Sequence, residues 1–235
     1  CSRAALLGDP TPGVIVSSFA VFAPGIVTGA YAEGKELCER TALLHARDEA
    51  TIASLSDVLA GEDVRAAAAV LRRGVEAASG AGRPLFSGLS DQTWPDSDVG
   101  QLWRAAELFR EHRGDSHVAA CVAAGLDPIE MNVMTELFVG MDLGTYSATR
   151  GWDKEALQGA AQRLRDRGLL DGDALNEAGR SFRSEIEDHT DLAQQSIITA
   201  IGDDLGALVE AATAWSQQCV DARAFPPNVF KRAAG

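Results

Sequence analysis

Apolar residues recur at helical spacing along most of the chain, and prolines and glycines mark the breaks between the helical segments. The pattern predicts helices over residues 64–78, over residues 99–124 before Gly125, and over residues 128–139. Residues 14–22 are apolar and partly β-branched, so this segment fits a helix or a strand. The chain is therefore expected to be mostly helical.

The second half of the chain shows a more specific order of elements. After the helix at 128–139, the pattern predicts a connector, a helix over 154–167, a tight hairpin over 169–175 and a helix over 176–190. Helix, helix, short hairpin and helix is the order of a winged helix, a helix-turn-helix variant. Two more helical segments are expected near residues 191–201 and 203–219.

These elements predict a mainly α fold, in which a helical N-terminal region packs on a degenerate winged-helix domain with one short β-hairpin. The expected division places the helical N-terminal region at residues 1–98 and the winged-helix-like domain at 99–190. C-terminal helices and a tail follow at 191–235.

A polar interruption stands out within the predicted helix at 99–124. At about 100° per residue, His112, Arg113 and Ser116 fall on the side that should be buried. Asp115 and His117 lie at its two edges, whereas Glu111 is expected to point outward. The apolar residues predicted on that buried side are Leu102, Ala105, Ala106, Phe109, Ala119 and Ala120. Burying charged groups costs several kcal/mol unless each finds a partner, so this cluster is a candidate site.

General acid–base chemistry fits the residue types of this cluster. His112 or His117 would move a proton near neutral pH, because histidine titrates there. Arg113 would hold a carboxylate or stabilise oxyanion charge, and Asp115 would orient an imidazole. The competing interpretation is a buried salt-bridge network in which both histidines are neutral and hydrogen-bonded.

No metal or other cofactor is expected. On a straight helix His112 and His117 diverge by about 140°, so one metal ion could not bind both unless Gly114 breaks the helix. Nucleotide-binding glycine loops, the nucleophile-elbow pattern and the paired-histidine zinc motif are absent from the sequence. The four cysteines are far apart, which favours reduced thiols in the cytoplasm over a disulfide framework.

The charge balance bears on partners. The formal net charge is −13, and a duplex repels such a surface because phosphate neutralisation supplies most of the affinity for nucleic acid. The winged helix carries Arg163, Arg165 and Arg167, but its wing contains Asp171 and Asp173, where phosphate contacts require basic residues. Nucleic acid is therefore not the expected partner. No run of 18 apolar residues predicts a membrane span.

Several strings together resemble the SalK-like proteins, an actinobacterial helix-turn-helix family whose members often lie near natural-product gene clusters. The matching strings are residues 102–106, 110–119, 124–127, 150–152, 163–170 and 177–180. The resemblance implies a winged-helix fold and draws attention to Arg3, Phe19, Phe22 and Trp152 beside the polar cluster. The family pattern starts some dozens of residues earlier, so a chain beginning at Cys1 is expected to be truncated.

The resulting hypothesis is a cytoplasmic small-molecule-handling protein of secondary metabolism. It would be a cofactor-independent acid–base enzyme of the isomerase, cyclase or lyase type, with a pocket built around the polar cluster. The ligand-binding residues would be Arg3, Phe19, Phe22, Trp103 and Trp152. The alternative is a ligand-responsive winged-helix transcription regulator, for which a homodimer would form the DNA-binding surface. Either protein would have a small molecule as its partner.

Overall fold

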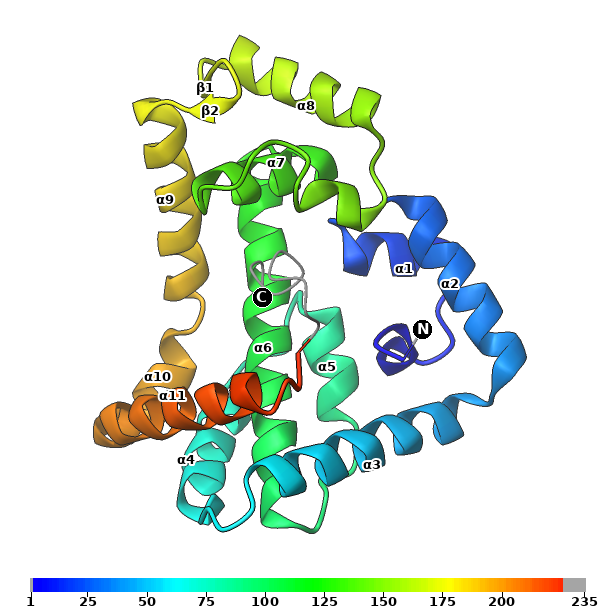
Figure 1. Ribbon diagram of the computed structural model, residues 1–235, viewed down its shortest axis with the longest axis vertical. Helices are drawn as coiled ribbons and strands as arrows, with labels where there is room; N and C mark the ends of the chain where they lie inside the picture. Colours follow the sequence, from blue (N-terminus) through cyan, green and yellow to red (C-terminus); the bar gives the residue numbers. More distant parts are fainter. Residues whose placement is uncertain (1, 226–235) are drawn as a thin grey trace. The chain divides into compact units, whose positions relative to one another are not determined.

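The computed structural model describes residues 2–225, and helices dominate its secondary structure (Figure 1). The α-helices are α1 (Pro12–Phe19), α2 (Pro24–Leu37), α3 (Arg40–Val58), α4 (Arg65–Glu76), α5 (Pro84–Ser90), α6 (Asp98–Ala123), α7 (Pro128–Phe138), α8 (Lys154–Asp166), α9 (Glu177–Leu192), α10 (Gln195–Ile201) and α11 (Leu205–Asp221). Short 3₁₀ helices are η1 (Ala4–Leu7), η2 (Ser147–Arg150) and η3 (Gly202–Asp204).

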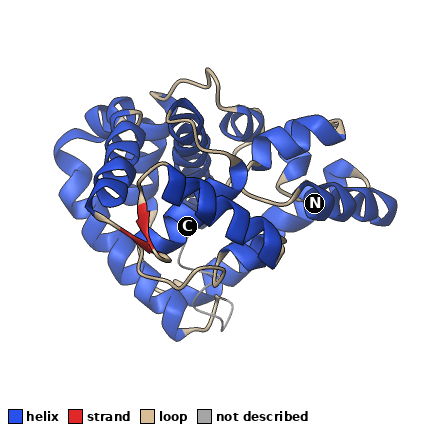
Figure 2. Cartoon of the chain, turned by 90° about the horizontal axis from the view of Figure 1, so that it is seen from above, coloured by secondary structure: helices blue, strands red, loops and turns tan. Residues whose placement is uncertain are grey.

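The sheet of the described chain is a single antiparallel hairpin of β1 (Leu170–Asp171) and β2 (Ala174–Leu175), visible in red in Figure 2. Leu170 pairs with Leu175, and Asp171 pairs with Ala174 across the turn. Gly172 has a φ of 58°, which suits glycine at this tight turn. The prediction of a mainly α fold with one short hairpin is confirmed.

The described chain divides into two compact units that interleave along the sequence. Unit 1 comprises residues 2–10, 34–116 and 192–225, and unit 2 comprises residues 11–33 and 117–191. One boundary precedes α1, and the other three fall inside α2, α6 and α9. The predicted division at residues 98 and 190 stays a prediction, because the two compact units do not test those boundaries.

The core of unit 1 gathers apolar residues from η1, α4, α5, α6 and α10. Gly74 on α4 allows the close approach of α10, since a Cβ there would lie 2.9 Å from Ile201 Cγ1. Leu85, Leu89 and Ile197 are each 1% exposed or less. These contacts fix the part of α6 that precedes His117.

The core of unit 2 is formed by α7, α8, the hairpin and α9. The apolar residues that share one side of α8 are all buried, namely Leu157, Ala160, Ala161 and Leu164. Asp127 forms a capping box with Glu130 and so defines the start of α7. Asp153 accepts a hydrogen bond from the Ala156 amide and begins α8. The order α7, α8, hairpin and α9 confirms the predicted order of a winged helix.

Three local expectations need correction or completion. The ambiguous segment at 14–22 is helical as far as Phe19, as α1. The short helix α5 lies between the predicted helices at 64–78 and 99–124, where the sequence pattern predicted no helix. Glu111 is fully buried, although it was expected to point outward, and Ala106 and Ala119 are exposed, although they were expected to be buried. The buried side of α6 is therefore rotated from the side that apolar spacing predicted.

Candidate functional site

Helix α6 carries the four predicted acid–base residues His112, Arg113, Asp115 and His117, and it continues unbroken through Gly114. His112, Arg113 and Asp115 lie in unit 1, whereas His117 begins the part of α6 that lies in unit 2. Each group therefore has its own set of neighbours. On this continuous helix the imidazoles of His112 and His117 lie on different sides, so the two rings are not placed to bind one metal ion.

His112 is 1% exposed and is held by groups from three segments of unit 1. Its Nδ1 lies 2.7 Å from Oε1 of Gln194, the residue before α10, and the Ser79 backbone also hydrogen-bonds the ring. The ring of Phe86 meets the imidazole edge-on at 5.0 Å between centroids. Burial is the main cause that lowers the pKa of His112, and the charge of Arg83 adds to it. A neutral, hydrogen-bonded histidine follows.

Asp115 is buried and accepts hydrogen bonds at the first turn of α5. Its Oδ2 lies 2.9 Å from the Leu85 amide nitrogen and 3.0 Å from the Phe86 amide nitrogen. Burial raises the pKa of Asp115 to about 6, although these two hydrogen bonds favour the charged form and act in the opposite direction. The carboxylate thus joins α6 to α5 rather than pointing at an imidazole.

The neighbouring residues of the cluster complete this connection between helices. Ser116 donates to the His112 carbonyl oxygen at 2.7 Å and accepts from Arg83 Nε at 2.8 Å. Arg83 also donates to the carbonyl oxygens of Ser79 and Ala81. Arg113 is partly buried. Sequence reasoning missed Arg83, because it precedes the unassigned helix α5.

A second set of buried charges on α6 was also missed. Arg104, Glu107 and Glu111 are each 3% exposed or less and follow one another along one side of the helix. Arg3 donates to both carboxylate oxygens of Glu111, at 2.8 and 2.6 Å. Arg3, predicted as a ligand-binding residue, thus takes part in an ion pair within unit 1.

Helix α3 supplies the partners for the remaining two charges. Arg104 Nη2 lies 2.5 Å from Asp48 Oδ2, and Arg47 pairs with Glu107. Burial lowers the pKa values of Arg47 and Arg104. The guanidinium of Arg47 also lies 5.6 Å from the ring centroid of Trp103, the other ligand-binding candidate of unit 1. Since both partners sit near the middle of α3, apolar spacing on α6 alone could not find this network.

In unit 2, His117 lies in a short chain of hydrogen bonds. Its Nδ1 is 3.0 Å from Thr190 Oγ1, and Thr190 in turn donates to the Ile186 carbonyl oxygen at 2.8 Å. His117 Nδ1 therefore carries the proton, which leaves Nε2 to accept from the Cys121 thiol at 3.5 Å. Burial raises the pKa of Cys121 to about 11. The thiol is thus protonated at neutral pH and is a poor nucleophile.

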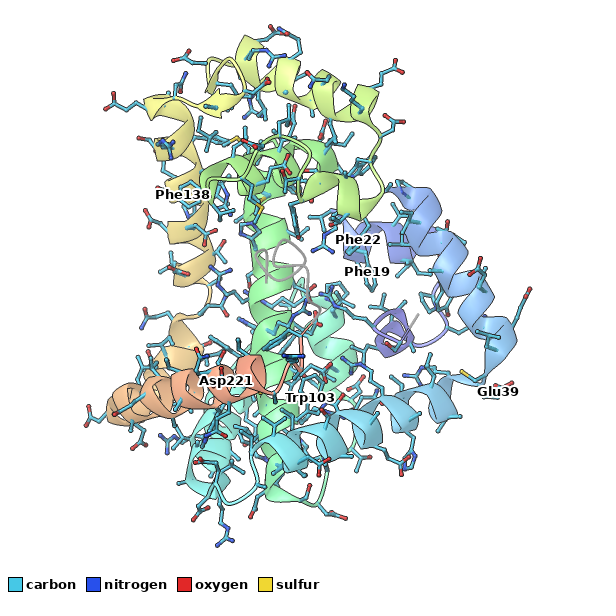
Figure 3. The ribbon with its side chains drawn as sticks, in the orientation of Figure 1. Phe19, Phe22, Glu39, Trp103, Phe138 and Asp221 are labelled. Carbon is cyan, nitrogen blue, oxygen red and sulfur yellow. The ribbon has the colours of Figure 1, made fainter. Side chains whose placement is uncertain are left out.

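The three remaining aromatic candidates gather around residues 19–23 of unit 2. The rings of Phe19 and Phe22 meet edge-on at 6.3 Å between centroids, and Figure 3 shows them side by side. Trp152 Nε1 and Asn132 Nδ2 both donate to the Val21 carbonyl oxygen, at 2.9 and 2.6 Å. The sequence thus predicted a group of side chains that the fold places in one region.

Arg150 lies at the centre of this aromatic cluster. It was not among the residues predicted to bind a ligand. Its guanidinium carbon lies 4.8 Å from the Phe22 ring centroid and 4.3 Å from that of Tyr146. Arg150 Nη2 also donates to the Tyr146 hydroxyl at 2.5 Å. Arg150 Nε, Ser147 Oγ and Asn132 Oδ1 are buried and lack a hydrogen-bond partner among the described residues. Buried polar atoms of this kind are commonly satisfied by a ligand or by ordered water.

The three arginines at the end of α8 and just after it have partners within unit 2. Arg163 pairs with Asp127 and Glu130 of the α7 capping box. Arg165 donates to the Gly172 carbonyl oxygen and to Asp173 in the wing. Arg167 contacts Glu130 and lies over the ring of Phe182. The exposed residues of α8 are Lys154, Glu155, Gln158, Gln162, Arg163 and Asp166. Their acidic and basic side chains balance, so the exposed side of α8 offers a phosphate no net positive charge.

A cavity of about 400 Å³ lies elsewhere in unit 1, beside the start of α4. Its lining includes the charged residues Glu62, Asp63, Arg65 and Asp98, together with Val64 and Val99. None of the predicted site residues lines it. Within residues 2–225, no group of three or more histidine, cysteine, aspartate or glutamate side chains is placed to hold a metal ion.

The order of elements in unit 2 defines a winged helix-turn-helix protein. A family model described as a helix-turn-helix family matches residues 1–226, and the chain belongs to that family. No curated protein and no solved structure matches the chain. Among the described helices, none combines the length and apolarity that crossing a membrane requires.

Proposed function

We propose that this protein binds a small anionic molecule through the aromatic cluster around Arg150, using the winged helix as a scaffold. The observation that carries the proposal is the arrangement of Arg150 itself. Two aromatic rings hold the guanidinium at 4.8 and 4.3 Å, while its buried Nε has no partner among the described residues. A fixed guanidinium with an unused donor suits a carboxylate, and aromatic neighbours suit a planar apolar body.

Other features support a small-molecule role. Phe19, Phe22 and Trp152 approach this region from two segments that are far apart in the sequence, as a preorganised binding site requires. The SalK-like resemblance, with its association with natural-product gene clusters, belongs to this proposal, as does a cytoplasmic location. We keep acid–base catalysis at His112, Arg113, Asp115 and His117 as a weaker hypothesis. His112 and Asp115 both take part in the packing of unit 1, which favours the salt-bridge-network interpretation.

The test is a binding titration with benzoate and related aromatic carboxylates, with benzamide as the uncharged analogue of benzoate. We expect at least one carboxylate to bind, benzamide to bind at least tenfold more weakly, and the Arg150→Met variant to lose the difference. Arg180→Met is the matched control, because Arg180 is exposed on α9. Failure of the whole carboxylate panel to bind, or unchanged binding to Arg150→Met, would overturn the proposal.

A ligand-responsive transcription regulator is the second candidate, and membership of the helix-turn-helix family favours it. In that case α8 would enter the major groove of DNA. Reversing Arg163 and Arg165 to glutamate would then abolish binding to upstream duplex DNA. Unchanged DNA binding by that double variant would count against α8 as the reading helix. The paired arginines, and the lack of net positive charge on the exposed side of α8, make this the weaker of the two candidates.

A further inference from the structure

Helix α11 differs from the other long helices of unit 1 in its charge and burial. None of its 17 residues is buried, and Glu210 is its one charged residue between Leu205 and Val220. By contrast, α3 carries charged side chains along most of its length. A long exposed helix with so little charge is the kind of surface that a partner covers.

The exposed residues of α11 include a stripe with coiled-coil spacing. Val209, Thr213, Ser216 and Val220 follow one another at intervals of four, three and four residues, so they lie on one side of the helix. Val209 is 56% exposed and Val220 is 40% exposed. The Thr213 hydroxyl donates to the Val209 carbonyl oxygen at 2.7 Å, so this polar group is already satisfied within the helix. We call these four residues the α11 stripe.

We propose that the α11 stripe pairs with the same stripe of a second copy of this chain, in an antiparallel arrangement. The spacing of the stripe is symmetric about its middle. A two-fold axis between Thr213 and Ser216 therefore places Val209 opposite Val220 of the other copy, and Thr213 opposite Ser216. Such an isologous contact uses one surface twice and closes into a dimer.

Charge argues for a second copy as the occupant. A chain with a net charge of −13 repels its own copies over most of its surface, whereas α11 offers a nearly neutral face at which two copies can meet. A basic or acidic partner would find almost no opposite charge on this helix. The small side chains of Thr213 and Ser216 also let two helix backbones approach each other closely at the centre.

The experiment measures molecular mass by light scattering after gel filtration, on the full chain at high micromolar concentration. The wild-type protein is expected to run at twice the mass of one chain. Val209→Lys places a charge opposite an apolar residue, so we expect at least a tenfold rise in the dimer dissociation constant. Val122→Lys is the matched control, because Val122 is a similarly exposed valine on α6; it should leave the dimer unchanged.

A double variant then tests the antiparallel register. In V209K/V220E, each lysine would face a glutamate of the other copy, so we expect the dimer to return. The two substituted positions are 11 residues apart on one helix, about 16 Å, so they cannot pair within one chain. A monomeric wild-type protein, or a dimer that persists in Val209→Lys, would overturn the proposal. Failure of the double variant to restore the dimer would overturn its antiparallel register.

Discussion

The two units of this protein solve the burial of polar groups in different ways. In unit 1, buried charges on α6 find partners that are far away in the sequence, as when Arg3 pairs with Glu111 across 108 positions. In unit 2, Glu136 is fully buried. It accepts hydrogen bonds from the backbone amides of Gly144, Tyr146 and Ser147, which follow it by 8, 10 and 11 residues in the sequence. Ion pairs between distant segments thus connect helices around α6 in unit 1, whereas this buried carboxylate of unit 2 is satisfied by nearby backbone amides.

This difference has a functional consequence. Buried side chains of unit 1 join α3, α5 and α10 to α6. Both units contain buried polar atoms without a hydrogen-bond partner among the described residues, and those of unit 2 include Arg150 Nε beside the aromatic cluster. The clearest polar pattern in the sequence thus joins helices of unit 1, and the binding site that we propose lies in unit 2.

The largest expected effect comes from breaking the ion pair of Glu111 in unit 1. Glu111→Ala removes a fully buried carboxylate and leaves Arg3 without its partner at this position, so unfolding free energy should fall by about 3–5 kcal/mol. Glu49→Ala is the control, since Glu49 makes an exposed pair with His45 and should change stability by less than about 0.5 kcal/mol. Urea denaturation measures both. A Glu111 variant as stable as the control would refute the view that ion pairs hold unit 1 together.

A cavity in the core of unit 2 should have a similar or slightly smaller effect. Leu164 on α8 is fully buried, so Leu164→Ala should cost about 2–5 kcal/mol. Leu192→Ala provides the exposed comparison. Because residues 111 and 164 belong to different units, their effects should add within about 0.5 kcal/mol in the double variant. A large departure from additivity would show that the two units do not respond independently.

Asp115 should make the stability of unit 1 depend on pH. Its pKa is raised in the folded state, to about 6 from an ordinary value of 3.8, so folding favours the protonated carboxyl. The free energy of unfolding of the wild type, relative to Asp115→Asn, should therefore rise as pH falls from about 7 to about 4, by an amount on the order of 2 kcal/mol. Denaturation series across this range measure the difference. A difference that stays constant with pH would contradict the assigned environment.

The smallest expected effect concerns the cysteine of unit 2. Cys121 is 1% exposed and its pKa is raised to about 11, so iodoacetamide should leave it unmodified in the native protein at neutral pH. Cys38 is exposed and should react readily, which makes it the internal reference. Mass spectrometry of the digested protein compares the two sites. Equal labelling of Cys38 and Cys121 would show that the chain of hydrogen bonds through His117 opens easily.

Much of the fold was predictable because its elements depend on local signals. Proline and glycine breaks, the Asp127 and Asp153 caps and the apolar spacing of α8 lie within a few residues of the structures they determine. The short hairpin was predictable for the same reason, because the glycine of its turn lies within the segment that it bends. Helix α5 was missed because its start depends on Asp115, which is 30 residues away from Leu85 in the sequence.

The site was less predictable for a related reason. The buried side of α6 is set by partners on α3, α5 and η1, so apolar spacing alone pointed to the wrong side for Glu111. Phe19, Phe22 and Trp152 were selected by resemblance and do gather in one region. Arg150 was missed as a site residue because its importance lies in its contacts with the Phe22 and Tyr146 rings, and Phe22 is 128 positions away in the sequence.

The most direct test of the account is a titration of the wild-type protein with mixed-sequence and upstream-region duplex DNA, at low and at physiological salt. The account holds that the winged helix is a scaffold in which Arg163, Arg165 and Arg167 are paired within unit 2. It therefore predicts no saturable binding at either salt concentration. Saturable binding whose affinity falls steeply with added salt would contradict it, because that dependence requires basic side chains that neutralise phosphates.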